Sequence, residues 1–265
     1  MKSYLLLKAS QKTLKDYWLI LIAKPQEIIF ILIVSGSNTT VKNVAYAIIP
    51  TEINSKYTIG KYYENGNFIS SLNIPIPGLH NLSNITAAIA ASRMIGVDFI
   101  EIKKNIKYLK LPKKRFEFRG QIDERNLYDD YAHHPKEIKE TIKLGRLFIK
   151  QQHNKEFQNN RLIAIFQPHR YSRVKQFTEE LAEELSKADI IYVTSIYGAG
   201  EGNVDKITSK IITDLIYKKN KNVFYINNYH EIRKNFYELT QKGDLILNMG
   251  AGDCHNFWSI LSEKK

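Results

Sequence analysis

Short apolar segments alternate with helical patterns from Phe116 to the end of the chain, and this alternation limits the fold more than any other feature. The stretches between the apolar segments are long enough for crossover helices. Because the segments are apolar at nearly every position, both faces of their sheet must be covered, which is typical of parallel sheets. The sequence therefore predicts an α/β fold with a doubly wound, mostly parallel sheet. The expected strands lie in "NLYDDYA", "RLIAIFQ", "DIIYVTSI", "NVFYIN" and "DLILNMG".

Polar or glycine-containing segments follow four of these strands. Parallel strands bring their carboxyl ends to one edge of a sheet, and ligands of such sheets bind there. We therefore expect the four segments to form one site. They are "DDYAHHP", "QPHRYSR", "SIYGAGEGN" and "NMGAGD".

In the first segment, Pro135 suits the first turn of a helix, which places His133 and His134 just before a helix N-terminus. The field there favours anions and neutral imidazole over imidazolium. A neutral histidine can donate to a phosphate or carboxylate, or accept a proton. Alternatively, one histidine caps the helix and the other faces solvent. Asp129 and Asp130 favour a functional role, because a carboxylate can orient an imidazole or accept ribose hydroxyls.

A metal site is less favoured, because no second cluster of histidine, aspartate or glutamate has recognisable ligand spacing.

Arg170 and Arg173 lie three positions apart at the opening of another helix. They can bind a carboxylate or phosphate bidentately. Alternatively, they pair with the acids of "EELAEEL". Asp253 is expected to cap the final helix.

The first part of the chain has a strand-and-turn pattern. Residues 18–23 and 28–34 predict buried strands, since neither run approaches the roughly 20 apolar residues of a membrane-spanning helix. "ENGN" fits a tight hairpin, and residues 81–95 predict a helix. The proline-containing basic stretch "KYLKLPKKR" is the candidate linker, which places two domains at 1–111 and 112–265.

The net charge of +12 could attract a polyanion such as nucleic acid. However, the lysines are scattered along the chain, and solvated surface lysines explain the charge equally well. We therefore expect no nucleic-acid partner and no membrane insertion. The single cysteine, Cys254, cannot form an internal disulfide, which indicates a reducing compartment.

Five strings, taken in order from about Pro77 to Trp258, resemble the Mur ligases of peptidoglycan synthesis. They are "PGLHNLSNITAAIAA", "KKRFEFRG", "YDDYAHHPKEI", "IFQPHRYSR" and "DLILNMGAGD". Within the family, "DDYAHHP" and "FQPHRYSR" are most similar to the members that join L-alanine to UDP-N-acetylmuramate. The resemblance implies a ligase that uses ATP and Mg²⁺ to form an acyl phosphate, which the amine of L-alanine attacks. It also implies the cytoplasm of a bacterium or the interior of a bacterial-derived organelle.

The resemblance also implies site residues by motif. Those implied for catalysis are His133, Arg170 and Arg173. Those implied for nucleotide binding are Asn84, Arg115 and Asp130, with Asp130 holding the ribose. Those implied for substrate binding are Tyr131 and His169.

One departure from the family pattern affects the expected function. The family's phosphate loop ends in Gly-Lys-Thr, but the sequence contains no G-x-x-x-x-G-K-[ST], and "VSGSNTT" at 34–40 lacks the lysine. Magnesium ligands are not evident either. The resemblance therefore implies a partial ATPase-type central domain before the carboxyl-terminal domain, with a separately encoded amino-terminal half as a candidate partner. A non-catalytic binding or scaffold remnant is the alternative. A dehydrogenase is disfavoured, because no G-x-G-x-x-G follows the first strand.

Overall fold

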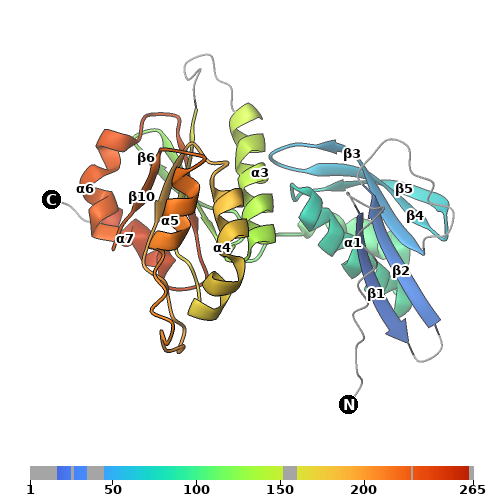
Figure 1. Ribbon diagram of the computed structural model, residues 1–265. Coiled ribbons are helices and arrows are strands. Elements are labelled where there is room, and N and C mark those ends of the chain that lie inside the picture. Colours follow the sequence, from blue (N-terminus) through green and yellow to red (C-terminus); the bar gives the residue numbers. More distant parts are fainter. Residues whose placement is uncertain (1–16, 25–26, 35–44, 152–159, 228, 263–265) are drawn as a thin grey trace. The chain divides into compact units, whose positions relative to one another are not determined.

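The computed structural model describes residues 17–24, 27–34, 45–151, 160–227 and 229–262 (Figure 1). The chain divides into two compact units, residues 1–110 and 111–265. None of the helices among the described residues is both long and apolar enough to cross a membrane.

The described residues of the first unit contain a five-stranded sheet in the order β1-β2-β3-β4-β5. Its strands are β1 (Tyr17–Lys24), β2 (Glu27–Val34), β3 (Tyr46–Ile53), β4 (Thr58–Glu64) and β5 (Asn67–Ile74). The hairpin expected at "ENGN" joins β4 to β5, with positive φ at Asn65 (48°) and Gly66 (78°). Two left-handed residues are what a tight hairpin turn requires. The runs at 18–23 and 28–34 are strands as expected, but their burial and residues 35–40 lie outside the description.

Helix α1 (Leu79–Met94) overlaps the helix expected at 81–95 and ends one residue earlier. It begins two residues earlier than expected, after Gly78, and its buried face includes Leu82, Ile85 and Ile89. Two short helical segments follow, α2 (Phe99–Asn105) and η1 (Ile106–Tyr108). The side chain of Asp98 caps α2 by accepting from the backbone N–H of Ile100 at 2.7 Å.

The second unit has a six-stranded sheet in the order β10-β9-β8-β11-β7-β6. All five strands expected from the sequence are present and pair in parallel with one another. β6 was not expected and pairs antiparallel with β7, which makes the sheet mixed. The strands are β6 (Glu117–Ile122), β7 (Arg125–Asp130), β8 (Leu162–Phe166), β9 (Ile190–Val193), β10 (Val223–Tyr225) and β11 (Leu245–Met249).

Alternate residues of the central strands enter two separate cores. In β11, Leu245 and Leu247 join the core containing residues from α3, α4 and α5, whereas Ile246 joins the core containing residues from α6 and α7. Both sheet faces are therefore covered, as the apolar strands predict. The helices are α3 (Pro135–Gln151), α4 (Tyr171–Leu185), α5 (Lys210–Tyr217), α6 (Tyr229–Leu239), η2 (Cys254–Asn256) and α7 (Phe257–Ser262).

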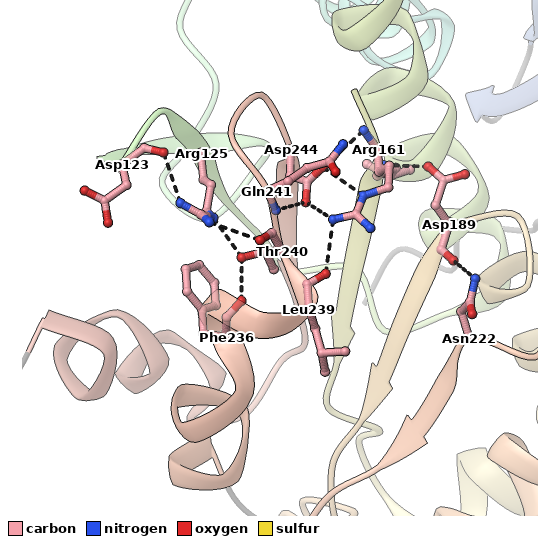
Figure 2. Close-up of polar contacts among 11 residues, drawn as sticks. Asp123, Arg125, Arg161, Asp189, Asn222, Phe236, Leu239, Thr240, Gln241 and Asp244 are labelled. Carbon is pink, nitrogen blue, oxygen red and sulfur yellow. Dashed lines mark hydrogen bonds and ion pairs between the residues drawn. The ribbon is translucent and has the colours of Figure 1, made fainter. Parts of the chain in front are cut away.

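A polar network closes the amino edge of this sheet (Figure 2). The carboxylate of Asp244 is fully buried and accepts from the Arg161 guanidinium at 2.7 Å and from the backbone N–H of Gln241 at 2.8 Å. The Arg125 guanidinium donates to the hydroxyl of Thr240 at 2.7 Å and to its carbonyl at 3.0 Å. These bonds attach the α6–β11 loop to the starts of β7 and β8.

Replacing Asp244 with alanine should lower the free energy of unfolding by about 3 kcal/mol, because it leaves the partly buried Arg161 guanidinium without its carboxylate. Urea denaturation measures this change. The matched control is Asp205→Ala, which removes an exposed ion pair with Lys175 and should change stability by less than about 1 kcal/mol. Equal losses in the two variants would contradict the role assigned to Asp244.

Candidate functional site at the carboxyl edge of the second sheet

Backbone hydrogen bonds join the segments that follow β7, β8, β9 and β11. Gly250 N–H donates to the Asp130 carbonyl at 3.1 Å, and Gln167 N–H donates to the Met249 carbonyl at 2.9 Å. A bridge pairs His169 with Tyr197. The four polar segments therefore meet along one edge, as the parallel order requires.

Asp129 points into the protein rather than toward this edge. Its Oδ1 accepts from Trp258 Nε1 at 2.6 Å and from Asn248 Nδ2 at 2.9 Å, and the Arg119 guanidinium lies 3.4 Å from Oδ2. Burial raises the pKa of Asp129, and the two side-chain hydrogen bonds oppose that rise. Asp129 therefore anchors α7 to the end of the sheet.

Asp130 holds two backbone segments at this edge, the one before β6 and the one after β7. Its Oδ2 accepts from the backbone N–H of Phe116 at 2.8 Å, and its Oδ1 accepts from the N–H of Ala132 at 2.8 Å. Phe116 and Lys114 have positive φ, 45° and 60°, a conformation that is unfavourable without such support. Asp130 thus holds the segment that carries Arg115. The ribose contact implied for Asp130 stays a prediction.

The two adjacent histidines have different environments. His134 caps α3, because its carbonyl accepts from Ile138 N–H and its Nδ1 accepts from Lys136 N–H at 3.3 Å. Burial lowers the pKa of His134, which keeps its ring neutral. The carboxylate of Glu137 accepts from both His133 N–H and His134 N–H, at 3.1 and 3.2 Å. Helix capping therefore accounts for His134 but not for the His133 ring.

The His133 ring lies near the segment that follows β8, although β11 separates β7 from β8 in the sheet. It lies 5.6 Å from the His169 ring and 5.2 Å from the Tyr131 ring, measured between centroids. Tyr197 stacks on the other ring, that of His169, at 5.6 Å. These four rings form one cluster, to which Arg173 adds a contact of 3.3 Å between its Nη1 and His169 Nδ1.

Arg170 precedes α4 in a left-handed conformation, with φ 68°. Its N–H donates to the Tyr197 carbonyl at 2.8 Å, which holds this turn in place. Its guanidinium lies 3.9 Å from Glu201, whose carboxylate also accepts from the N–H and hydroxyl of Ser172, at 3.0 and 2.7 Å. The acid facing Arg170 is therefore Glu201, not one of the "EELAEEL" acids.

The glycine-rich loop after β11 packs directly on the strand ends. A Cβ on Gly252 would lie 2.5 Å from Gln167 Oε1 and 2.6 Å from the Tyr197 ring. The expected capping role of Asp253 is wrong: no side-chain capping bond is made, because Asp253 Oδ1 accepts instead from Gln167 Nε2 at 2.6 Å.

Arg115 and Asn84 are the two remaining residues implied by the motifs. The Arg115 guanidinium is 3.8 Å from the Glu137 carboxylate and lies over the Tyr131 ring at 5.6 Å, adjoining the ring cluster. Asn84 is exposed on α1 and belongs to the first unit. The second unit thus brings together seven of the eight residues implied by the motifs.

Motif reasoning missed Glu137, Tyr197 and Glu201, which contact the implied residues. It also missed Gln167, which holds the loop after β11 through Asp253. Glu137 had a detectable signal, because glutamate three residues after an N-cap is typical of a helix start. Glu201 contacts Ser172 across 29 positions, and no local pattern indicates that contact. Among the described residues, no group of three or more histidine, cysteine, aspartate or glutamate side chains could hold a metal ion.

Asp130→Asn should lower the free energy of unfolding by about 1–3 kcal/mol, because an amide NH₂ group cannot accept the backbone N–H bond that one carboxylate oxygen accepts. Burial raises the pKa of Asp130 to about 6 from 3.8. A raised folded pKa stabilises the protein fully below the unfolded pKa, and that contribution is lost as pH rises through the folded pKa. The stability gap between wild type and variant should therefore be larger near pH 4 than above about pH 6.

Denaturation at several pH values measures this gap. Asp214→Asn, on the exposed side of α5, is the matched control and should stay within about 0.5 kcal/mol of wild type. A gap that widens as pH rises would contradict the environment described for Asp130.

Gly252→Ala should destabilise the second unit by about 1–3 kcal/mol, because the methyl group overlaps Gln167 and Tyr197. Gly202→Ala is the control, since a Cβ there meets no heavy atom within 4 Å. Thermal unfolding compares the two variants. Equal melting temperatures would show that the loop does not pack as described.

Comparison with known proteins identifies the family. The model of the Mur ligase glutamate ligase domain matches residues 114–252, just over half of the chain. A UDP-N-acetylmuramate–L-alanine ligase from Prochlorococcus marinus subsp. pastoris is 64% identical over 223 residues, covering 84% of this chain and 47% of that protein. One from Synechococcus sp. CC9311 is 38% identical over 227 residues, with 84% and 47% covered.

The fold comparison agrees. The UDP-N-acetylmuramate–alanine ligase MurC of Thermotoga maritima has a TM-score of 0.65 at 24% identity, over 83% of this chain and 46% of that one. The chain spans about half the length of the curated relatives it matches, and the matching part is their carboxyl-terminal portion. The chain belongs to the Mur ligase family.

Proposed function

We propose that this chain supplies the carboxyl-terminal part of an ATP-dependent site that ligates L-alanine to UDP-N-acetylmuramate through an acyl phosphate. The observation that carries the proposal is the cluster of His133, His169, Arg170 and Arg173 on one sheet edge. Two guanidiniums and two imidazoles suit a reaction whose substrates and intermediate are carboxylates and phosphates. The 64% identical relative has this activity in its name, which supports the choice of substrates.

The nucleotide contacts proposed for this chain are partial. Asp130 accepts from the backbone N–H of Phe116 and so positions the segment that carries Arg115. The Arg115 side chain is 44% exposed, which suits contact with a phosphate or base. The described residues offer no cluster for Mg²⁺, and the sequence contains no phosphate loop. We therefore assign no phosphoryl-transfer step to this chain. A polypeptide bearing a phosphate loop must supply that step.

The test measures ADP release with Mg²⁺, ATP, UDP-N-acetylmuramate and L-alanine. One reaction contains the chain alone, and a second adds the part of the Prochlorococcus marinus ligase that precedes its matching portion. We expect release only in the mixture, and only with both substrates present. Release by the chain alone would show that it needs no second polypeptide. No release from a mixture of folded proteins would favour the non-catalytic remnant.

Arg170→Met should reduce turnover of the mixture about 10- to 100-fold, the effect of losing a charged hydrogen bond in the reacting complex. Lys218→Met is the charge-matched control, because Lys218 is exposed at the C-terminal end of α5. Its turnover should equal that of wild type. Equal losses in the two variants would indicate a general charge effect rather than a role for the site arginine.

A further inference from the structure

The sheet of the second unit ends in two edge strands, β6 and β10, which differ in how they are protected. An exposed edge attracts other strands, and proteins usually block it with charged side chains or a bulge. β6 has both, because "EFRGQI" contains two charged residues and its register with β7 shifts after Phe118. β10 (Val223–Tyr225) has no charged side chain and no register shift. It is therefore a short but unprotected edge.

The outer side of β10 carries backbone groups that no described residue binds. On the inner side, Ile226 N–H donates to the Val193 carbonyl at 3.0 Å, and the Asn222 carbonyl accepts from β9 at 2.9 Å. The direction of the backbone groups alternates along a strand, so the N–H and C=O groups of Val223 and Tyr225 point outward. Two donors and two acceptors are therefore available to another strand.

A groove of about 530 Å³ adjoins this edge and is lined by residues of β9, β10 and α6. Its sheet side includes Tyr192, Phe224 and Ile226, and its helix side includes Lys234 and Glu238. The Phe224 ring stacks on the buried Tyr192 ring, with 5.5 Å between centroids, yet Phe224 remains 38% exposed. Covering this ring would remove apolar surface from water, which favours association.

A second copy of this chain matches both the edge and the groove. If two β10 strands pair antiparallel around Phe224, Val223 of each copy lies opposite Tyr225 of the other, which forms four backbone hydrogen bonds. The two Phe224 residues are then the non-hydrogen-bonded pair between them, with Cα atoms about 4.5 Å apart and side chains in contact. Both rings lie on the sheet face that α6 covers, beside the groove of each copy.

The charges of the groove also favour a second copy over a peptide of one charge sign. Glu231, Lys234 and Glu238 are spaced three and four positions apart on α6, which places them on one face of the helix. The glutamates would repel an acidic peptide, and Lys234 would repel a basic one. A two-fold axis reverses the direction of α6 in the second copy, so that Lys234 of each copy can face a glutamate of the other.

We propose that β10 and the adjoining groove form a symmetric interface for a second copy of this chain. The two β10 strands pair antiparallel around Phe224, and the sheets of both copies become one continuous sheet. Because the edge is short, we expect a monomer–dimer equilibrium rather than a permanent dimer. The interface contains none of the residues implied for ligation, so this inference does not rest on the proposed function.

Sedimentation velocity of the full chain over a wide range of concentrations tests for the dimer. The sedimentation coefficient should rise with concentration. Phe224→Ala should raise the dissociation constant about tenfold or more, the usual loss when a central aromatic residue is removed from an interface. Tyr108→Ala, which removes a 67% exposed ring from the first unit, is the control and should leave the constant unchanged. A wild-type chain that stays monomeric at every concentration would overturn the proposal.

Two substitutions of Val223 test the strand pairing separately from the aromatic contact. Val223→Pro removes an outward N–H, and edge strands tolerate proline at such positions. It should weaken dimerisation about tenfold or more, whereas Val223→Ala, which keeps the N–H, should weaken it less than threefold. Thermal unfolding shows whether both variants are folded. Equal dissociation constants for the two folded variants would show that the strands do not pair.

Cysteine cross-linking tests the register. Phe224→Cys places two thiols on Cα atoms about 4.5 Å apart, a distance that a disulfide can span. Mild oxidation at high protein concentration should therefore give a covalent dimer that a reducing agent separates. Tyr217→Cys, at an exposed position of α5, is the control and should stay monomeric, since the native Cys254 is buried. A solution dimer without the Phe224→Cys cross-link would place the interface elsewhere and overturn the proposal.

Discussion

Parallel pairing of β7, β11, β8 and β9 is the constraint on which the site depends. It brings four strand ends to one edge, although they are separated by long stretches of sequence. The backbone bonds between those ends then leave little freedom for the loops. The loop after β8 is attached to the loop after β9. A bridge pairs His169 with Tyr197, and Arg170 N–H donates to the Tyr197 carbonyl. Local loop sequence alone cannot produce this geometry.

Four carboxylates fix the loops and helix starts at this edge by accepting hydrogen bonds. Asp129 accepts hydrogen bonds from the side chains of Trp258 and Asn248. Asp130 accepts hydrogen bonds from the backbone before β6 and after β7. Glu137 and Glu201 each accept N–H groups at the start of a helix and also face a basic side chain of the site. These anions offset the positive charge of the guanidiniums and restrict where they can move, which favours a preorganised site.

Much of the second unit follows from the sequence for a physical reason. A strand buried on both faces must be apolar throughout, so β8 and β11 are recognisable from "LIAIF" and "LILNM". The sequence did not predict β6, because "EFRGQI" has no fully buried residue and contains glycine, as an antiparallel edge strand can. Asp253 was misassigned because its Gln167 partner lies 86 positions away. The strand ends that carry the site could be predicted from the sequence. The contacts of Asp129 and Glu201 could not, because they join residues far apart in the sequence.

The central proposal is that the cluster of His133, His169, Arg170 and Arg173 at the carboxyl edge binds the reacting acyl phosphate. The most direct measurement is a crystal structure of the chain together with the phosphate-loop polypeptide and a phosphinate analogue of the reaction intermediate. The account predicts analogue oxygens within about 3 Å of the Arg170 or Arg173 guanidinium. An analogue bound elsewhere, with the cluster facing only solvent, would contradict it.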